Sequence, residues 1–415
     1  MTEYNNKRNI TLIIGCLIGN MLEFYDLILF GIFSPVIGPL FFPSESKFIS
    51  TVLVFSSFAL GFICRPLGSV YFGTIADKMG RKKSLCISLI LMSTATGIIG
   101  LIPTYSQIGV IAPIIVILAR CLQGFSAGGE YNSVAVFLVE HYYDKKNIIA
   151  SVLTASGVIG SLLATWFLDI TLKVNIKELW RGAFLFGACV GFIGLYIRVN
   201  LLESIQFVEI QKDNELLSNP LKDVWLTNKS ELTTSLVIGA FNGIIYYFQF
   251  VYLTLHFTIY LNIELQDANY YTSIGLLSYF VFLILNGFVA EFVGTRRTVL
   301  FSCVCFSVLT PFIFFYVNTN TALIIICEIL LAFMNASFCG LKHVILIDLF
   351  PVNKRCTGVS LGYSLGLTIF GGTTPLIMHT LSSYFCPFSG SLFISTAGVI
   401  CFIIIFMDKG LKKNY

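Results

Sequence analysis

Residues 73–83 read GTIADKMGRKK and connect two long apolar segments. This short connection holds one acid, Asp77, and two glycines, Gly73 and Gly80, followed by a basic cluster. Glycine permits a tight reversal because it adopts positive φ without a Cβ clash. Lysine and arginine are costly in hydrocarbon, so the connection is expected on the cytoplasmic side of a membrane. A simple positive loop would explain the basic residues, but neither the acid nor the glycine spacing.

The composition of the 415 residues is typical of a membrane protein, with 56% hydrophobic residues, 12% charged residues and a mean hydropathy of +0.85. Several windows hold about twenty apolar residues, the length that a helix needs to cross the hydrocarbon core. These runs are continuously apolar instead of alternating, which excludes a transmembrane barrel. The sequence therefore predicts an all-α polytopic membrane protein.

Twelve transmembrane helices are predicted, six on each side of a polar segment. They are expected at about 10–38, 50–76, 83–102, 109–138, 147–171, 181–200, 233–260, 269–292, 297–317, 321–348, 355–384 and 390–407. The predicted domains are an N-terminal six-helix bundle (1–200), a cytoplasmic linker (201–232) and a C-terminal six-helix bundle (233–415).

The basic residues indicate the orientation of the chain. Of its 26 lysines and arginines, 18 fall on one side of the predicted spans and four on the other. Because cytoplasmic loops carry the excess of lysine and arginine, both termini and the linker are predicted to be cytoplasmic. The expected location is the bacterial inner (plasma) membrane. The basic residues lie in short loops between spans, so nucleic acid is not an expected partner.

The opening motif occurs twice. Residues 287–297 read GFVAEFVGTRR, with the glycine, acid, glycine and basic spacing of 73–83 repeated 214 residues later. A second pair supports the repeat, since Glu140 and Asp348 each end a predicted span and are followed by basic residues. Two halves of parallel topology, related by an axis along the membrane normal, are typical of one large class of secondary transporters.

With these motifs the chain resembles the major facilitator superfamily, whose loop motif between helices two and three is similar to residues 73–83. Further stretches resemble the metabolite:proton symporters within it, at 19–26, 65–68, 120–131, 349–351 and 371–375. Within that group the likeness is greatest to proline/glycine-betaine symporters, although relatives carry α-ketoglutarate, citrate or shikimate. Ile205 and Thr295 depart from the family pattern, and a long C-terminal coiled-coil extension is not expected after Tyr415.

Charges inside spans are costly and usually face a cavity. Glu23 and Asp26 are three residues apart and share a helix face, and their mutual repulsion in a low dielectric favours proton binding by one of them. The alternative is that one of them is a permanently ionised partner of Arg65 or Arg120. Glu130 is the third candidate for proton coupling.

Arg65 and Arg120 lack acids in their own helix turn, so each is expected to meet an acid on another span or a substrate carboxylate, which the guanidinium binds in two places. Aromatic faces would suit a quaternary ammonium. However, 15% of the residues are aromatic, and most of them are expected only to pack against neighbouring side chains or lipid. The other predicted substrate-binding residues are Tyr25, Tyr131, Tyr246, Tyr247 and Gln249. Glu328 is expected to be shallow and extracellular.

The repeated motifs predict a cytoplasmic latch. Asp77 is expected to pair with Arg81 and to face the N-terminus of the eleventh span, near Arg355, where a carboxylate is stabilised by the helix dipole. A second latch is expected from Glu291, Arg297 and Asp348. The predicted gating set is Gly73, Asp77, Gly80, Arg81, Glu140, Glu291, Arg297, Asp348 and Arg355.

These features predict proton-coupled uptake of a small zwitterion such as proline or glycine betaine by alternating access. The alternative substrate is a di- or tricarboxylate such as α-ketoglutarate or citrate. Drug efflux is less expected, because residues 156–161 of the fifth span continue without the proline of that class. No nucleophile, metal-ligand set or phosphate loop is visible, so neither an enzyme nor a cofactor is expected, with the proton as coupling ion. The expected partners are a small-molecule substrate and the lipid bilayer, with no obligatory protein partner.

Overall fold

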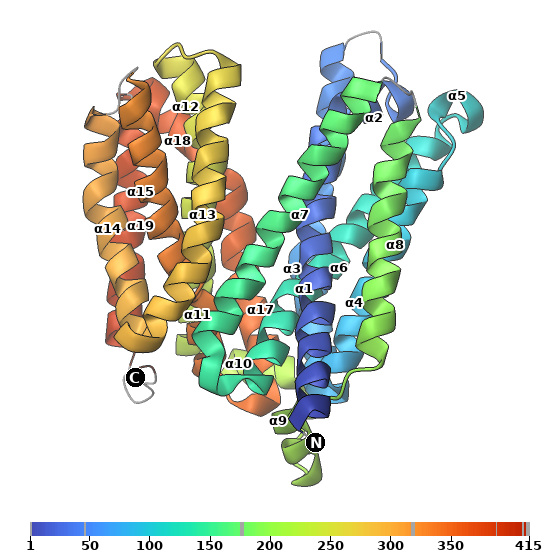
Figure 1. The fold of residues 1–415 in the computed structure, drawn as a ribbon, viewed down its shortest axis with the longest axis vertical. Coiled ribbons are helices and arrows are strands. Elements are labelled where there is room, and N and C mark those ends of the chain that lie inside the picture. The colour runs from blue at the N-terminus through green and yellow to red at the C-terminus, as the bar shows by residue number, and fades with distance from the viewer. Residues whose placement is uncertain are drawn as a thin grey trace. The chain divides into compact units, whose positions relative to one another are not determined.

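The computed structural model describes residues 2–44, 47–174, 178–316, 320–386, 388–408 and 411. Side chains are described for these residues apart from 2–9, 172, 174 and part of 47–58. Every regular element in these ranges is a helix, which confirms the all-α fold class (Figure 1). Seven basic residues used to predict the orientation lie outside the described side chains: Lys7, Arg8, Lys47, Lys177, Lys409, Lys412 and Lys413.

The chain forms two compact units that are not the simple halves of the sequence. Unit 1 comprises Met1–His141, Ser156–Lys222 and Val352–Ser360, and unit 2 comprises Tyr142–Ala155, Asp223–Pro351 and Leu361–Tyr415. The ends of two helices thus belong to the unit formed mainly by the other half of the sequence. The domain boundaries expected at residues 200 and 233 stay a prediction.

Unit 1 contains most of the first six predicted spans and the start of the linker. Its helices are α1 (Thr2–Ile32), α2 (Ser34–Phe41), α3 (Lys47–Met79), α4 (Arg81–Leu101), α5 (Tyr105–Ile108), α6 (Ile111–His141), α8 (Leu179–Val199), α9 (Ile205–Lys212) and the 3-10 turn η3 (Val352–Lys354). Three helices contribute residues to both units: α7 (Lys146–Val174), α10 (Pro220–Thr227) and α17 (Arg355–Gly366).

Unit 2 contains the remaining spans. Its elements are η1 (Tyr143–Lys145), α11 (Lys229–Tyr247), η2 (Phe248–Tyr252), α12 (Leu253–Tyr260), α13 (Leu265–Val293), α14 (Thr295–Tyr316), α15 (Thr321–Cys339), α16 (Lys342–Leu349), η4 (Leu367–Gly371), α18 (Gly372–Tyr384) and α19 (Ser389–Met407). Of these, η2 and η4 are π-helical turns, and each continues directly into the helices on both sides of it.

Eleven helical stretches of the described chain are long and apolar enough to cross a membrane. Twelve were predicted from the sequence. The residues of the remaining span, 355–384, are helical throughout but are divided among α17, η4 and α18. A π-helical turn alone does not exclude a span, since Lys229–Tyr260 contains η2 and is among the eleven. Residues 355–384 are less apolar because they are rich in glycine, serine and threonine.

Close helix packing in unit 1 brings the polar residues of α3 and α6 together. A methyl group placed on Gly124 would overlap the carbonyl of Gly61, and one on Gly128 would overlap the carbonyl of Arg65. Ser69 also donates a hydrogen bond to the carbonyl of Gly128, at 2.8 Å. Small residues allow such backbone contact between membrane helices. The glycines of the fourth span therefore serve helix packing.

The two copies of the opening motif adopt the same backbone geometry. Gly80 precedes α4 with φ 106° and ψ 148°, and Gly294 ends α13 with φ 97° and ψ 137°. Residues with a Cβ are strained at these angles. The second glycine of the motif is thus required by the reversal between consecutive helices in both halves.

Replacing Gly80 by alanine is expected to lower the free energy of unfolding by roughly 1–3 kcal/mol, the usual cost of a strained backbone residue. Gly372→Ala is the control, because Gly372 is helical and an added Cβ there meets no atom within 4 Å. Thermal unfolding in detergent compares the two variants. Equal stability of Gly80→Ala and Gly372→Ala would contradict the assignment.

Candidate functional site

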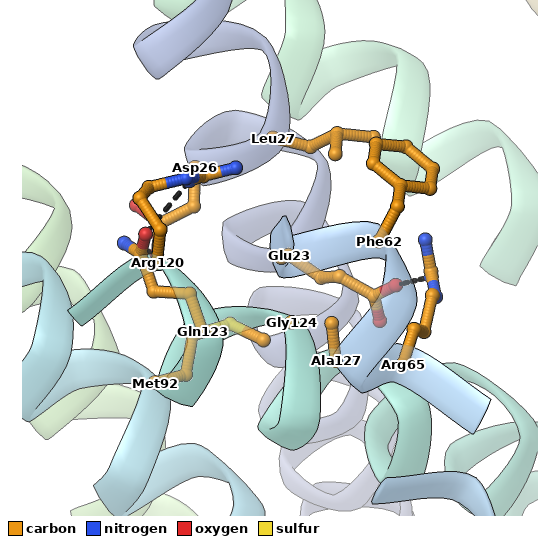
Figure 2. A pocket seen from close by; sticks show the side chains of 11 residues that line it. Glu23, Asp26, Leu27, Phe62, Arg65, Met92, Arg120, Gln123, Gly124 and Ala127 are labelled. Atoms are coloured by element: carbon orange, nitrogen blue, oxygen red, sulfur yellow. Dashed lines mark hydrogen bonds and ion pairs between the residues drawn. The ribbon is translucent and has the colours of Figure 1, made fainter. Parts of the chain in front are cut away.

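Unit 1 contains a pocket between α1, α3, α4 and α6. Its empty volume is about 380 Å³, and eleven residues line it (Figure 2). Most of the wall is apolar. The polar and charged lining residues are Glu23, Asp26, Arg65, Arg120 and Gln123.

Glu23 and Arg65 form an ion pair between α1 and α3. Arg65 Nη2 donates to Glu23 Oε1, and the side chains are 10% and 2% exposed, respectively. Figure 2 shows the Glu23 carboxylate directed toward this guanidinium. The second oxygen, Oε2, is buried and accepts no hydrogen bond from any described residue. Glu23 and Asp26 were expected either to bind a proton or to pair with Arg65 or Arg120. Glu23 has the arginine partner.

Asp26 lies in a different environment, although it shares the helix face with Glu23. Its carboxylate accepts hydrogen bonds from the hydroxyl of Thr96 and from Gln123 Nε2, the latter at 3.2 Å. Gln123 Oε1 in turn accepts a hydrogen bond from Arg120 Nη1 at 2.7 Å, and the guanidinium carbon of Arg120 lies 4.4 Å from the centre of the Phe30 ring. Neutral donors therefore contact Asp26 directly, and Arg120 is linked to it through Gln123.

Gln123 was not predicted as a site residue. Its position three residues after Arg120 in an apolar span was the available indication, because residues so spaced lie on one helix face. The structure shows that it joins Arg120 to Asp26 and Thr96.

Glu130 does not line the pocket and is fully compensated. Arg198 of α8 binds both of its oxygens, at 2.5 Å and 3.0 Å, and the Ser88 hydroxyl donates to Oε2 at 2.8 Å. Arg198 also donates to the carbonyls of Gly15 and Cys16 in α1. Arg198 was not predicted as a site residue. The available indication was its charge near the end of an apolar span, which is costly without a partner.

The tyrosines predicted to bind substrate in unit 1 lie elsewhere. Tyr25 donates its hydroxyl to the carbonyl of Ala183 at 2.7 Å, which ties α1 to α8. Tyr131 is 4% exposed and packs edge-on against Phe24 with ring centres 5.8 Å apart. Neither tyrosine is among the residues that line the pocket, and their role in substrate binding stays a prediction.

The predicted residues of the seventh span lie in unit 2 at the junction of α11 and η2. Gln249 is buried and donates to the carboxylate of Glu328 at 3.2 Å, while its own oxygen accepts from Asn335 at 3.1 Å. Tyr246 packs against the Phe250 ring at 5.0 Å, and Tyr247 is half-buried. Gln249 thus takes part in a buried side-chain network. Glu328 is completely buried within the protein.

Asp77 holds the N-terminus of α17 in unit 1. Its carboxylate accepts the backbone N–H of Cys356 at 3.2 Å and of Thr357 at 2.7 Å. The first amides of a helix have no partner within it, and the helix dipole favours a negative charge there. Arg81 Nη1 lies 3.4 Å from Asp77 Oδ1. Both contacts expected for Asp77 are present, and a role in gating stays a prediction.

Glu140 lies between two arginines in the same network. Its Oε2 is 3.4 Å from Arg81 Nε, and its Oε1 accepts from Arg355 Nη1 at 2.9 Å. The Ser204 hydroxyl donates to Oε2 as well. Arg81 Nη2 also donates to the carbonyl of Val352 at 2.6 Å. The predicted first latch is therefore one buried network.

The start of the linker completes this network, which the sequence did not reveal. Glu203 accepts the backbone N–H of Arg81 at 3.1 Å and of Lys82 at 3.2 Å, which caps the N-terminus of α4. Gln206 Oε1 accepts from Arg355 Nη1 at 2.6 Å. The linker segment was read only as a polar connection, since nothing in its composition indicates which helix ends it contacts.

The second predicted latch, of Glu291, Arg297 and Asp348, has other contacts than expected. Asp348 pairs with Lys146 at 2.8 Å. Glu291 and Arg297 are exposed and form no ion pair among the described residues. Instead, the hydroxyl of Thr295 donates to Asn147 Oδ1 at 2.7 Å. The ion pairs expected among Glu291, Arg297 and Asp348 are thus not formed in this structure, because the acid and the base of this motif copy are exposed, and a gating role for these residues stays a prediction.

Comparison with known proteins identifies the class of this fold. Residues 11–223 match the family described as sugar (and other) transporter. A citrate-proton symporter of Klebsiella pneumoniae is 31% identical over 375 residues, which cover 88% of this chain and 84% of the relative. A putative proline/betaine transporter of Staphylococcus aureus (strain COL) is 28% identical over 440 residues, covering 99% and 93%.

The fold is shared with solved transporters. The structure of the proton:xylose symporter XylE of E. coli, bound to 6-bromo-6-deoxy-D-glucose, gives a TM-score of 0.78 at 15% identity, covering 97% of this chain and 96% of the other. The fold is that of a membrane transporter of the major facilitator superfamily. The chain belongs to its sugar (and other) transporter family. This family and the relatives are transporters rather than enzymes.

Removing one partner of the buried Glu130 pair is expected to destabilise the protein. Arg198→Met leaves the Glu130 carboxylate uncompensated, at a cost of roughly 3–5 kcal/mol. The double variant Glu130→Gln with Arg198→Met is expected to recover much of the loss. The control, Lys173→Met, breaks a pair with Asp169 in which both side chains are more than half exposed, and it is expected to cost at most about 1 kcal/mol. Thermal unfolding in detergent measures all three, and a single variant as stable as the double one would refute the pairing.

Loss of the Asp77 carboxylate is expected to free the N-terminus of α17. Cys356 is completely buried and reports on this event, because thiol alkylation requires exposure. Asp77→Asn should increase its alkylation rate by a maleimide, measured by mass spectrometry of the peptide, and should change the transport rate. Glu291→Gln, the equivalent change at the exposed acid of the second motif copy, is the control. Unchanged alkylation and transport in Asp77→Asn would refute the contact's role.

Proposed function

We propose that this transporter is a proton-coupled symporter of a small carboxylate-bearing solute. The observation that carries the proposal is the pocket of unit 1, where two acids and two arginines line one cavity. Charged groups inside membrane spans are retained where they serve a substrate or ion path. The names of the relatives add support, since one is a citrate-proton symporter and another a putative proline/betaine transporter.

Asp26 is the proposed coupling acid. Neutral donors contact it directly, and one of its buried oxygens, Oδ1, accepts no hydrogen bond from any described residue. A carboxyl in such surroundings exchanges a proton more readily than one held by a guanidinium, as Glu23 and Glu130 are. Glu23 is the second candidate because it lines the same pocket. We assign Glu130 a structural role.

A zwitterion is the first candidate substrate. The pocket has two acids and two arginines, so its formal charge is balanced when all four are ionised. A solute with one carboxylate and one cationic nitrogen adds no net charge to this balance. Arg120 offers a guanidinium to the carboxylate, and the cationic end would lie near an acid.

A di- or tricarboxylate is the second candidate. Two arginines in one pocket suit a solute with several carboxylates, because each guanidinium binds one in two places. Protonation of the acids would then give the pocket the net positive charge that such an anion requires. The citrate-proton symporter of Klebsiella pneumoniae is the relative that favours this reading.

The coupling ion in this proposal is the proton, and no cofactor takes part. We place the protein in the bacterial inner membrane with both termini and the linker in the cytoplasm, in accord with the distribution of lysine and arginine. The network around Asp77, Arg81, Glu140 and Arg355 is the proposed cytoplasmic latch. Its contacts would break and re-form as the two faces of the transporter open in turn.

Uptake into proteoliposomes tests the proposal. Labelled proline, glycine betaine, α-ketoglutarate and citrate are supplied separately, with and without an inward proton gradient. One of them is expected to accumulate above its external concentration only when the gradient is present. Uptake of none of them, or uptake that ignores the gradient, would refute proton-coupled transport of this solute class.

Asp26→Asn is expected to abolish accumulation driven by the gradient while exchange of labelled for unlabelled solute continues, because exchange needs no net proton movement. Asp169→Asn is the matched control, since Asp169 is exposed and pairs with its helix neighbour Lys173. Gradient-driven accumulation by Asp26→Asn at the wild-type level would remove Asp26 from the coupling step.

A further inference from the structure

Unit 2 contains a buried acid that the proposed function does not use. Glu328 is the only charged residue between Thr321 and Leu341, in the middle of α15. Its side chain is completely buried. An acid in an apolar span is retained at a cost, so its surroundings indicate what it does.

One side of this carboxyl is held by a single neutral donor. Gln249 Nε2 donates to Glu328 Oε2 at 3.2 Å and to the Glu328 backbone carbonyl at 3.1 Å. Asn335 fixes Gln249 by donating to its oxygen at 3.1 Å. Gln249 lies in the π-helical turn η2, and π-helical turns occur frequently at functional sites.

The other side of the carboxyl is apolar. Glu328 lines a closed apolar pocket that has no room for a water molecule, and its other lining residues are Leu253, Phe257, Ile313, Phe314, Cys327 and Leu331. Its Oε1 is buried and accepts no hydrogen bond from any described residue. On the side of α13, Gly275 leaves room for Oε2, because a methyl group placed there would overlap this oxygen.

No basic side chain compensates Glu328 among the described residues. Among the titratable groups of the packed elements, Cys327 is the neighbour of Glu328 on its own helix, and the rings of Tyr252 in η2 and His256 in α12 lie against Phe314. Tyr271 and Tyr279 belong to α13; Tyr271 packs edge-on against Phe257, and the Tyr279 ring is tilted against Phe250. Glu23, Glu130 and Glu140 each have an arginine within ion-pair distance, and Glu328 has none.

We propose that the Glu328 carboxyl is a second proton-binding site of the transporter, located in unit 2. The inference rests on the proposed proton-coupled transport and adds a carboxyl outside the pocket of Glu23 and Asp26. The step is the binding of one proton by one carboxylate, with no other bond formed or broken. In the geometry described, the acid carries the proton, because an ionised carboxylate there would lack both a cation and water. It releases the proton when water reaches the apolar pocket.

A proton suits this site better than a metal cation. Na⁺ and other hard cations require several oxygen ligands. Here the carboxylate is the only acidic group, and the amide oxygen of Gln249 is already bonded to Asn335. No group of three or more His, Cys, Asp or Glu that could hold a metal occurs among the described residues.

Infrared difference spectroscopy of the reconstituted protein tests the site without any substrate. The carbonyl band of a protonated buried carboxylic acid is expected at neutral pH, and it should be absent in Glu328→Gln, which preserves the size of the side chain. Glu264→Gln is the control, because it makes the same change at an exposed acid of the same unit. A band that persists unchanged in Glu328→Gln would overturn the inference. Should that variant fail to fold, Glu328→Asp must still show the band, at a shifted position.

Transport then separates this inference from the proposed function. The number of protons taken up per solute is measured with a pH dye, using whichever of proline, glycine betaine, α-ketoglutarate and citrate the wild type accumulates. Glu328→Gln is expected to lower this number, and replacing Na⁺ by choline should not change it in the wild type. Two results would overturn the Glu328 site but not the proposed function, provided that wild-type uptake is driven by the proton gradient. One is an unchanged number of protons per solute in Glu328→Gln, and the other is a wild-type number that depends on Na⁺. Wild-type uptake indifferent to the gradient would overturn the proposed function, whereas the infrared band would still report on Glu328.

Discussion

Charge compensation in a low-dielectric interior is the constraint on which the arrangement of unit 1 depends. A lone ion is poorly solvated there, so a buried ionised acid is stabilised when it meets a base across a helix interface, as Glu23, Glu130 and Glu140 do. Arg198 of α8 satisfies this requirement for Glu130 of α6 and also bonds the carbonyls of α1 and α4. Arg65 does the same for Glu23. These contacts determine which helices are neighbours, whereas the apolar side chains around them fill the remaining space.

The two copies of the loop motif show how one backbone device supports different chemistry. Both use a glycine with positive φ between consecutive helices. In unit 1 the motif acid binds a helix N-terminus and joins two arginines and Glu140 in one buried network. In unit 2 the motif acid is exposed, and the hydroxyl of Thr295 bonds Asn147 instead. Thr295, which departs from the family pattern, is thus the residue that forms the neutral contact.

Acids illustrate why environment, not residue type, assigns a role. Glu23 and Asp26 lie on one helix face, yet an arginine binds the first and neutral donors contact the second. Glu130 is likewise an acid within an apolar span, but Arg198 binds both of its oxygens. Glu328 is buried beside a π-helical turn, and no base pairs with it among the described residues. A helical wheel gives the direction of such a side chain, but the partners come from helices far away in the chain.

The sequence by itself determined the fold class, the internal repeat, the family and the acids and arginines of the pocket. Each of these follows from hydrophobic length, motif spacing or the cost of charge in a span, which are local properties of the chain. Only the tertiary structure revealed the linking role of Gln123, the pairing of Arg198, the contribution of Glu203 to the latch and the packing roles of Tyr25 and Tyr131. Apolar spans are alike in composition, so their neighbours are decided by shape and by complementary polar groups. Those are relations between helices, which no single stretch of sequence contains.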